Sequence, residues 1–260
     1  MPLRLEPTLR DRLARSGRPL AGMWVCSGSP LVAEICAGAG LDWLLIDMEH
    51  APNGLESVLA QLQAVAAYPV TPVVRVPSDD PVAIKQVLDV GARNLLVPMV
   101  DSEDQAKGAV AAVRYPPLGK RGVGSALGRS ARWNRVENYL ADADSHVSLY
   151  VQVESVAGVA AAASIAAVDG IDGVFVGPSD LAASMGLIGQ QTHPDVIDAV
   201  ARTFVAVLGA GKPVGVNAFD QALAQRYVEA GASFVLVAAD VAALARASEE
   251  VAHRWVPAGQ

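Results

Sequence analysis

The feature that most constrains the fold is a short unit that occurs four times along the chain. In each copy a helix-like segment ends at glycine, a run of apolar residues follows, and the run leads to an acidic residue. Glycine supplies the left-handed conformation that often ends a helix, and a continuous apolar run is typical of a strand buried on both faces of a parallel sheet. The unit therefore predicts alternating helices and strands. Its copies are Gly40–Asp47, Gly91–Asp101, Gly170–Asp180 and Gly231–Asp240.

Further apolar runs of this kind bring the number of expected strands to eight. Eight alternations of strand and helix within 260 residues favour a (β/α)8 TIM barrel, an α/β fold, as a single domain over residues 1–260. The longest gap, between the fourth and fifth expected strands, holds an inserted loop or helix at about 115–146, with an amphipathic-looking piece around Trp133 to Leu140. Loops of this length tend to be functional. The expected strands lie at about 20–26, 43–47, 72–76, 94–99, 148–153, 173–177, 213–217 and 234–238.

Polar residues mark where several of the helices begin. A serine or aspartate that precedes a helical segment can accept hydrogen bonds from its first backbone N–H groups, and proline fits the first helical position. The expected starts of this kind are Ser29–Pro30, Asp80–Pro81, Ser155 and Asp220.

Charge and apolar patterning exclude several classes of protein. The net charge of −7 argues against nucleic acid or an anionic membrane as a partner. Residues 1–19 lack the apolar core of a signal peptide, and the apolar stretch 156–168 is too short to span a bilayer. Two cysteines, Cys26 and Cys36, are too few for a disulfide scaffold. We therefore expect a soluble cytoplasmic protein that acts on small molecules.

Polar side chains gather where the expected strands end, and in a barrel these ends share one mouth. No lysine of the sequence is placed at a strand exit, so a Schiff-base enzyme is not expected. A metal ion is the other means of polarising a carbonyl group. Glu154 and Asp180 could supply two carboxylates from adjacent strands to Mg²⁺ or Mn²⁺. The strand-end set is Asp47, Glu49, His50, Arg75, Gln152, Glu154, Asp180 and Asn217.

A series of segments from about Gly22 to Asp240 matches one protein family in order and in spacing. The segments are Ile46–Asn53 (Ile-Asp-Met-Glu-His-Ala-Pro-Asn), Val74–Arg75, Lys85–Ala92, Leu96–Met99, Arg114–Pro117, Arg121–Gly124, Gln152–Ser155 and Gly177–Leu181. With them the chain resembles the class II pyruvate aldolases of the HpcH/HpaI family. The resemblance implies reversible aldol cleavage of a 4-hydroxy-2-oxo acid to pyruvate and an aldehyde.

The resemblance also implies a role for individual residues. A divalent metal (Mg²⁺ or Mn²⁺, or else Co²⁺) would be held by Glu154 and Asp180. His50, paired with Asp47, would be the acid–base group, and Arg75 would stabilise the enolate oxygen. The remaining expected substrate contacts are Gln152 and the backbone amides of Ser179 and Asp180.

Several alternatives stay open at this point. Arg75 could form a salt bridge with Glu49 or pair with Glu154 and Asp180 at the barrel rim, and Trp24 could either wall the pocket or pack in the core. Asn217 stands where family members usually carry an apolar residue, which leaves open which aldehyde the protein prefers.

The family forms hexamers, so the resemblance implies a homo-oligomer whose insertion, with Arg121–Gly124, reaches a neighbour's active site. The other functions to consider are a CoA-ester lyase of the citrate-lyase-like superfamily, oxaloacetate decarboxylation on the same site, and a barrel kept as a binding module. The CoA-ester lyases lack the ending that this chain carries at Glu49–Asn53, which argues against that alternative.

Overall fold

The computed structural model describes residues 3 and 5–257. Eight parallel strands close into a barrel in chain order, with the first strand paired to the last. The expected (β/α)8 barrel is confirmed, and the bounds of the strands differ from the expected ones by two residues at most. The strands are β1 (Leu20–Val25), β2 (Trp43–Asp47), β3 (Thr71–Arg75), β4 (Asn94–Val97), β5 (Ser148–Val153), β6 (Gly173–Val176), β7 (Val214–Asn217) and β8 (Phe234–Ala239).

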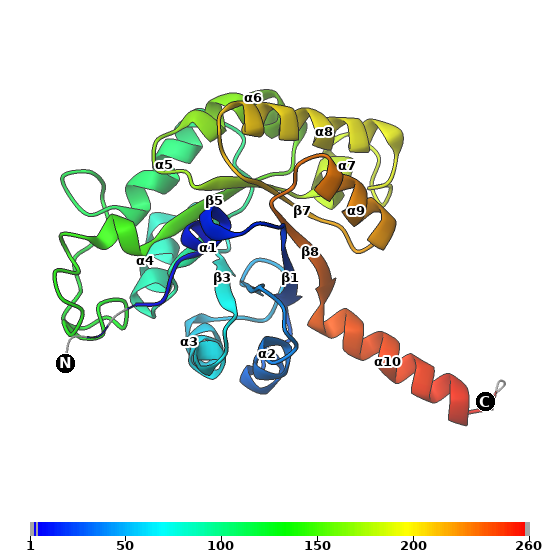
Figure 1. The fold of residues 1–260 in the computed structure, drawn as a ribbon, viewed down its shortest axis with the longest axis horizontal. Coiled ribbons are helices and arrows are strands. Elements are labelled where there is room, and N and C mark those ends of the chain that lie inside the picture. The colour runs from blue at the N-terminus through cyan, green and yellow to red at the C-terminus, as the bar shows by residue number, and fades with distance from the viewer. Residues whose placement is uncertain (1–2, 4, 258–260) are drawn as a thin grey trace.

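Helices follow the strands and surround the barrel (Figure 1). The four expected helix starts are confirmed, because each capping side chain accepts a hydrogen bond from the first turn of α2, α4, α6 or α9. The helices are α1 (Leu9–Arg15), α2 (Pro30–Ala37), α3 (Leu55–Ala64), α4 (Pro81–Asp89), α5 (Glu103–Val113), α6 (Val156–Ala167), α7 (Pro178–Ser184), α8 (Pro194–Gly209), α9 (Gln221–Glu229) and α10 (Asp240–Trp255), with 3-10 turns η1 (Val65–Ala67) and η2 (Ala143–His146).

Large side chains fill the interior of the barrel. The rings of Trp43, Phe175 and Phe234 contact one another there, with edge-on contacts between Trp43 and both phenylalanines. Two glycines make room for these rings, because a Cβ atom on Gly22 or Gly215 would lie 2.4 Å from the ring of Trp43 or Phe234. The interior is therefore a packed core, and only the strand exits are free to form a site.

The N-terminal end of the barrel is closed by α1. Leu9 is buried in the interior cluster, and its backbone N–H donates to Asn94 Oδ1 at 2.8 Å. Asn94 also accepts from Ser148 Oγ and donates to the carbonyl of Pro72. These hydrogen bonds of Asn94 hold α1 against β4. The opposite end of the barrel, where the strands exit, is left for ligands.

The inserted segment between α5 and β5 is built from turns and η2. The piece at 133–140, which looks amphipathic in the sequence, is not an α-helix. Positive φ values at Trp133, Asn134 and Asn138 interrupt the helical conformation there. A small buried cluster that includes Tyr115 and Tyr139 holds the segment together.

Arg121 belongs to this buried part of the inserted segment. Its guanidinium lies 4.5 Å from the ring centre of Tyr115 and 3.5 Å from Asp89 Oδ1. The side chain is therefore buried within its own chain, whereas Val123, two residues later, is exposed. Of the stretch 121–124, it is the part around Val123 that is free to contact a neighbour.

The last helix, α10, extends away from the barrel (Figure 1). Its residues after Asp240 are exposed, including Leu244, Val251 and Trp255. Asp240 itself is buried, and its carboxylate accepts hydrogen bonds from the backbone N–H groups of Cys26 and Ser27. This contact ties the start of α10 to the exit of β1. Within the described part of the chain, we find no helix with the length and hydrophobicity needed to cross a membrane.

Candidate active site

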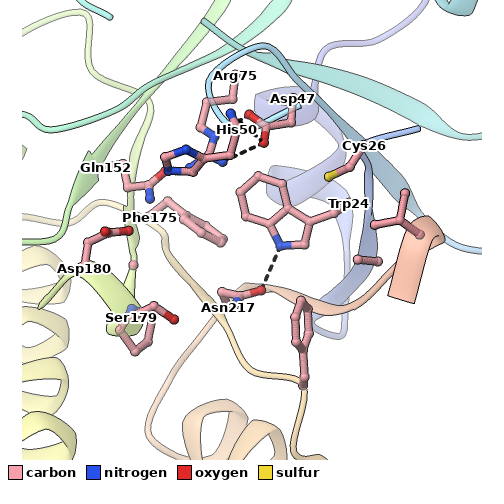
Figure 2. Close-up of a pocket in the computed structure, with 15 residues that line it drawn as sticks. Trp24, Cys26, Asp47, His50, Arg75, Gln152, Phe175, Ser179, Asp180 and Asn217 are labelled. Atoms are coloured by element: carbon pink, nitrogen blue, oxygen red, sulfur yellow. Dashed lines mark hydrogen bonds and ion pairs between the residues drawn. The ribbon is translucent and has the colours of Figure 1, made fainter. Parts of the chain in front are cut away.

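The exits of the strands surround a cavity of about 360 Å³ (Figure 2). It collects nearly all of the side chains that the sequence singles out as site residues. Two residues are exceptions and do not line the cavity: Glu154, which is buried and hydrogen-bonded to Gln152, and Glu49, which pairs with Arg75. The predicted residues that line it are Trp24, Asp47, His50, Arg75, Gln152, Ser179, Asp180 and Asn217.

Arg75 forms ion pairs with two carboxylates at one side of the cavity. Its Nε and Nη2 atoms donate to the two oxygens of Asp47, each at 2.8 Å, and its Nη1 atom lies 2.8 Å from Glu49 Oε2. Burial disfavours the charge of Arg75, but the hydrogen bonds and charges of Asp47 and Glu49 outweigh it and raise its pKa. The expected alternative of a salt bridge to Glu49 is thus present, together with a stronger, bidentate pair to Asp47.

The pKa of Glu49 is raised as well, but for a carboxyl group a higher pKa disfavours the charged form. Burial raises the pKa of its carboxyl group, and the nearby carboxylates of Asp47 and Asp180 add to the rise. The positive charge of Arg75 opposes it only in part. The site therefore holds more negative than positive charge on this side.

Trp24 has both of the roles considered for it. Its ring belongs to the interior core and also lines the cavity. The guanidinium of Arg75 lies 4.3 Å from the ring centre, and Nε1 donates to Asn217 Oδ1 at 2.8 Å. Asn217 is thereby fixed at the exit of β7 (Figure 2). Trp24 links the polar groups of β7 and β3 across the mouth.

His50 differs from the expectation in its partner. Its backbone N–H, not its imidazole, contacts Asp47, at 3.3 Å from Oδ2. The imidazole Nε2 atom lies 3.9 Å from Glu49 Oε2, and the side chain is 64 % exposed. Asp47 is occupied by Arg75 because β2 and β3 pair at these two residues. The imidazole is consequently free to reach a ligand in the cavity.

Glu154 is 2 % exposed and is held by two donors. Oε1 accepts from the backbone N–H of Met99 at 2.8 Å, and Oε2 accepts from Gln152 Nε2. Burial raises the pKa of Glu154 to about 7, and the nearby carboxylates of Glu49 and Asp180 contribute, while the Met99 hydrogen bond opposes the rise. This buried carboxyl group therefore lies in an excess of negative charge that a cation would relieve.

The turn from β6 into α7 brings the last part of the site. Proline at the first helical position starts α7, and Ser179 and Asp180 follow in its exposed first turn. The backbone N–H groups at a helix start have no partner within the helix and favour an anion. Gly177 precedes them, and a Cβ atom there would lie 2.6 Å from Glu154 Oε2. This glycine lets Glu154 approach the turn that carries Asp180.

The donor set fits a hard divalent cation with few protein ligands. Among the described residues, no group of three or more histidine, cysteine, aspartate or glutamate side chains is arranged to hold a metal. Glu154 and Asp180 are close enough for Asp180 to raise the pKa of Glu154. The buried Oε1 atom of Gln152 accepts no hydrogen bond from any described residue. Two carboxylates and a nearby amide oxygen suit Mg²⁺ or Mn²⁺, whose other positions take water or substrate.

Apart from Trp24, the sequence did not predict the apolar walls of the cavity. Most of these positions follow or end strands as the polar ones do, whereas Phe175 lies within β6. An apolar side chain at a strand exit looks the same in the sequence as one in the core. Their place at the ends of β1, β7 and β8 is the only signal that could have identified most of them. The additional lining side chains are Cys26, Phe175, Phe219, Ala239 and Val241.

Comparison with known proteins agrees with this geometry. The HpcH/HpaI aldolase/citrate lyase family matches residues 20–247 of the chain. A 4-hydroxy-2-oxo-heptane-1,7-dioate aldolase from Salmonella heidelberg (strain SL476) is 53 % identical over 251 residues, which cover 96 % of this chain and 95 % of the relative. A relative of the same name from Salmonella typhi is 52 % identical with the same coverage.

Solved structures show the same likeness. A HpcH/HpaI aldolase/citrate lyase family protein from Burkholderia cenocepacia J2315 has a TM-score of 0.90 and 45 % identity, and the match covers 95 % of this chain and 98 % of that one. A HpcH/HpaI aldolase from Desulfitobacterium hafniense DCB-2 has a TM-score of 0.88 and 29 % identity, over 98 % of this chain and 100 % of that one.

Proposed function

Because the chain belongs to the HpcH/HpaI aldolase/citrate lyase family and is a carbon–carbon lyase of the aldolase type, we propose that it cleaves 4-hydroxy-2-oxo acids reversibly to pyruvate and an aldehyde. The observation that carries the proposal is the gathering of His50, Arg75 and Asp180 around one cavity, with Glu154 hydrogen-bonded to Gln152 in its wall. Each of these groups has a distinct task in an aldol cleavage.

Glu154 and Asp180 are the residues that would hold a divalent cation, Mg²⁺ or Mn²⁺. When bound, such a cation supplies Lewis-acid polarisation of the substrate's C2 carbonyl group. The excess of negative charge around Glu154, which raises its pKa to about 7, supports a cation at this position.

His50 would take the proton from the C4 hydroxyl group. Loss of this proton lets the C3–C4 bond break, so the aldehyde leaves and the electron pair passes to the pyruvate half as an enolate. The exposed imidazole at the mouth suits this task, because the C4 hydroxyl group and the leaving aldehyde would both lie on the solvent side of the cavity. Reprotonation of the enolate at C3 gives pyruvate.

Arg75 would stabilise the negative charge that develops on the C2 oxygen. Its charge is fixed before the substrate binds, because Asp47 and Glu49 hold the guanidinium and raise its pKa. Preorganised positive charge of this kind lowers the barrier without reorganisation during the reaction. Asp47, expected among the catalytic groups, would then act by positioning Arg75.

The two ends of the substrate would lie at opposite sides of the cavity. The free N–H groups at Ser179 and Asp180 would receive the carboxylate of the pyruvate half, with Gln152 beside it. The aldehyde half would lie against Trp24, Asn217 and Phe219. Since the curated relatives are named for 4-hydroxy-2-oxo-heptane-1,7-dioate, we propose this dioate as the first substrate to test.

The direct test of the reaction is pyruvate release from this dioate, followed by coupled oxidation of NADH. Protein dialysed against EDTA should be inactive, and Mg²⁺ or Mn²⁺ should restore its activity. Activity that survives EDTA and is trapped by borohydride would contradict the proposal, because it would indicate a Schiff base.

We further propose that the chain forms a homo-oligomer, a hexamer, and acts in the cytoplasm. Two groups of exposed apolar side chains support self-association: Leu244, Val251 and Trp255 on α10, and Leu118 and Leu127 on the inserted segment. Both cysteines are free thiols, which fits a reducing compartment.

A further inference from the structure

The segment after β4 departs from regular strand geometry beside the site. Val97 is the last residue of β4 in register with β5, where it pairs with Val151. The pairing resumes at Val100, whose backbone N–H donates to the carbonyl of Gln152 at 3.0 Å. Pro98 and Met99 lie between these two points. The chain therefore bulges between its pairings with Val151 and Gln152, shortly before Glu154 on the neighbouring strand.

Met99 has a left-handed backbone, with φ of 53°. A positive φ is uncommon for residues other than glycine and is disfavoured for a long side chain. The other described non-glycine residues with positive φ are all in the inserted segment. Such conformations persist where the surroundings hold them, and they gather at functional sites.

Packing of the Met99 side chain does not explain this conformation, because the side chain is 47 % exposed. The interaction that does accompany it is a single hydrogen bond from the Met99 backbone N–H to Glu154 Oε1, at 2.8 Å. The other oxygen, Oε2, faces Gln152 and the Gly177 turn, which leads to Asp180. The two oxygens of Glu154 therefore have different surroundings: Oε1 accepts from the bulge, and Oε2 lies at the Gly177 turn.

We propose that Met99 is a positioning residue for Glu154. Its left-handed backbone aims the N–H group at Oε1, and this hydrogen bond leaves Oε2 directed toward Asp180 for the cation. The inference rests on the proposed function, since it concerns the orientation of a proposed metal ligand. It assigns the effect to the backbone of Met99 and not to its thioether side chain.

The test measures Mn²⁺ affinity by calorimetry on EDTA-treated protein without substrate. In Met99→Gly the affinity should stay within about twofold of the unchanged chain, because glycine adopts positive φ freely and keeps the N–H group. In Met99→Val the affinity should fall by about tenfold or more, the usual effect of losing a partner of a metal ligand. A β-branched residue disfavours the left-handed conformation and turns the N–H group away from Glu154.

Asn138→Val is the matched control. Asn138 has φ of 55° in the inserted segment, so the substitution imposes the same kind of backbone penalty away from Glu154. Its Mn²⁺ affinity should equal that of the unchanged chain. If Met99→Val does not fold, Met99→Ala carries the test with a smaller expected loss, again restored by Met99→Gly.

If Met99→Val (or Met99→Ala, where that variant carries the test) binds Mn²⁺ as tightly as the unchanged chain, the inference is overturned. It is also overturned if Met99→Gly loses as much Mn²⁺ affinity as that variant does. A Glu154→Gln variant separates this result from the proposed function. If Glu154→Gln binds Mn²⁺ as well as the unchanged chain does, the metal site itself is wrong and the inference falls with it. If Glu154→Gln loses Mn²⁺ but Met99→Val keeps it, only the role of Met99 is wrong.

Discussion

At the scale of single residues, the site depends on a division of charge between β2, β3 and β5. Asp47 and Glu49 neutralise Arg75, whereas Glu154 lies in the remaining negative charge and has a raised pKa. His50 stands apart from both groups, exposed at the mouth. Substitutions at these positions should therefore have separable effects on the catalytic rate, the stability of the fold and the affinity for the metal.

His50→Ala should reduce turnover by about 10²–10⁴-fold, the usual contribution of a general acid or base. Mn²⁺ affinity should not change, because the exposed imidazole is not a proposed metal ligand. Steady-state kinetics and calorimetry measure the two effects. His253→Ala, on the exposed face of α10, is the control. Near-normal turnover in His50→Ala would remove this residue from the mechanism.

Arg75→Ala should lower the rate by roughly 10²–10³-fold, because the enolate oxygen loses its preorganised positive charge. It should also reduce the free energy of unfolding by about 3–5 kcal/mol, since Asp47 would be left buried without its partner. Urea denaturation measures the second effect. An unchanged rate in folded protein would show that Arg75 does not act on the enolate.

Mn²⁺ affinity should weaken as the pH falls below about 7, by up to about tenfold per pH unit, because Glu154 must lose its proton to bind a cation. The metal-free protein should show the reverse trend in stability. Burial places the folded pKa of Glu154 above its ordinary value of 4.5, so the unfolded chain releases the proton first and stability falls from about pH 4.5 to about 7. A Mn²⁺ affinity that is constant between pH 5 and 7.5 would contradict this assignment.

At the scale of elements, the β6–α7 turn joins Glu154 to the first turn of α7. Gly177→Ala would place a Cβ atom 2.6 Å from Glu154 Oε2 and 2.7 Å from Gln152 Nε2, so both side chains must move. Mn²⁺ affinity should fall by about tenfold. Gly209→Ala at the end of α8, where a Cβ meets no atom within 4 Å, is the control. Equal affinities in the two variants would show that the turn does not position Glu154.

The strands and helix starts could be predicted because each has a local cause in the sequence. Apolar runs that end at polar residues mark the strands, and Ser29 or Asp80 next to proline marks a helix. The amphipathic look of the piece at 133–140 was misleading. Val136 and Tyr139 join the cluster with Tyr115, but the backbone turns there, and Trp133 and Leu140 stay exposed, which spacing alone does not reveal.

The sequence predicted which residues lie at the site better than it predicted which side chains pair with one another there. Asp47 and His50 are near neighbours in the sequence, but Asp47 pairs with Arg75 because β2 and β3 are in register there. Glu154 was correctly placed at the exit of β5, but its burial and its hydrogen bonds from Gln152 and from the backbone of Met99 were not predicted. Contacts of this kind depend on how strands pair, which a single sequence does not record.

At the scale of the whole molecule, exposed apolar side chains on α10 support self-association. Light scattering coupled to size exclusion should give about six times the chain mass of 26.9 kDa. Leu244→Glu with Val251→Glu should lower that mass, because both apolar side chains would be lost from the exposed helix. The charge change Glu249→Gln on the same helix is the control. A single-chain mass for the unchanged protein would contradict the proposed hexamer.

The central claim is that one cation lies between Glu154 and Asp180, within reach of a keto acid that also meets Arg75 and His50. Crystals soaked with Mn²⁺ and pyruvate, measured at the manganese absorption edge, test it most directly. The account predicts one anomalous peak with carboxylate oxygens of both residues about 2.0–2.3 Å away. An anomalous peak at another position would contradict it, and so would the absence of a peak between these carboxylates in crystals that hold pyruvate in the cavity.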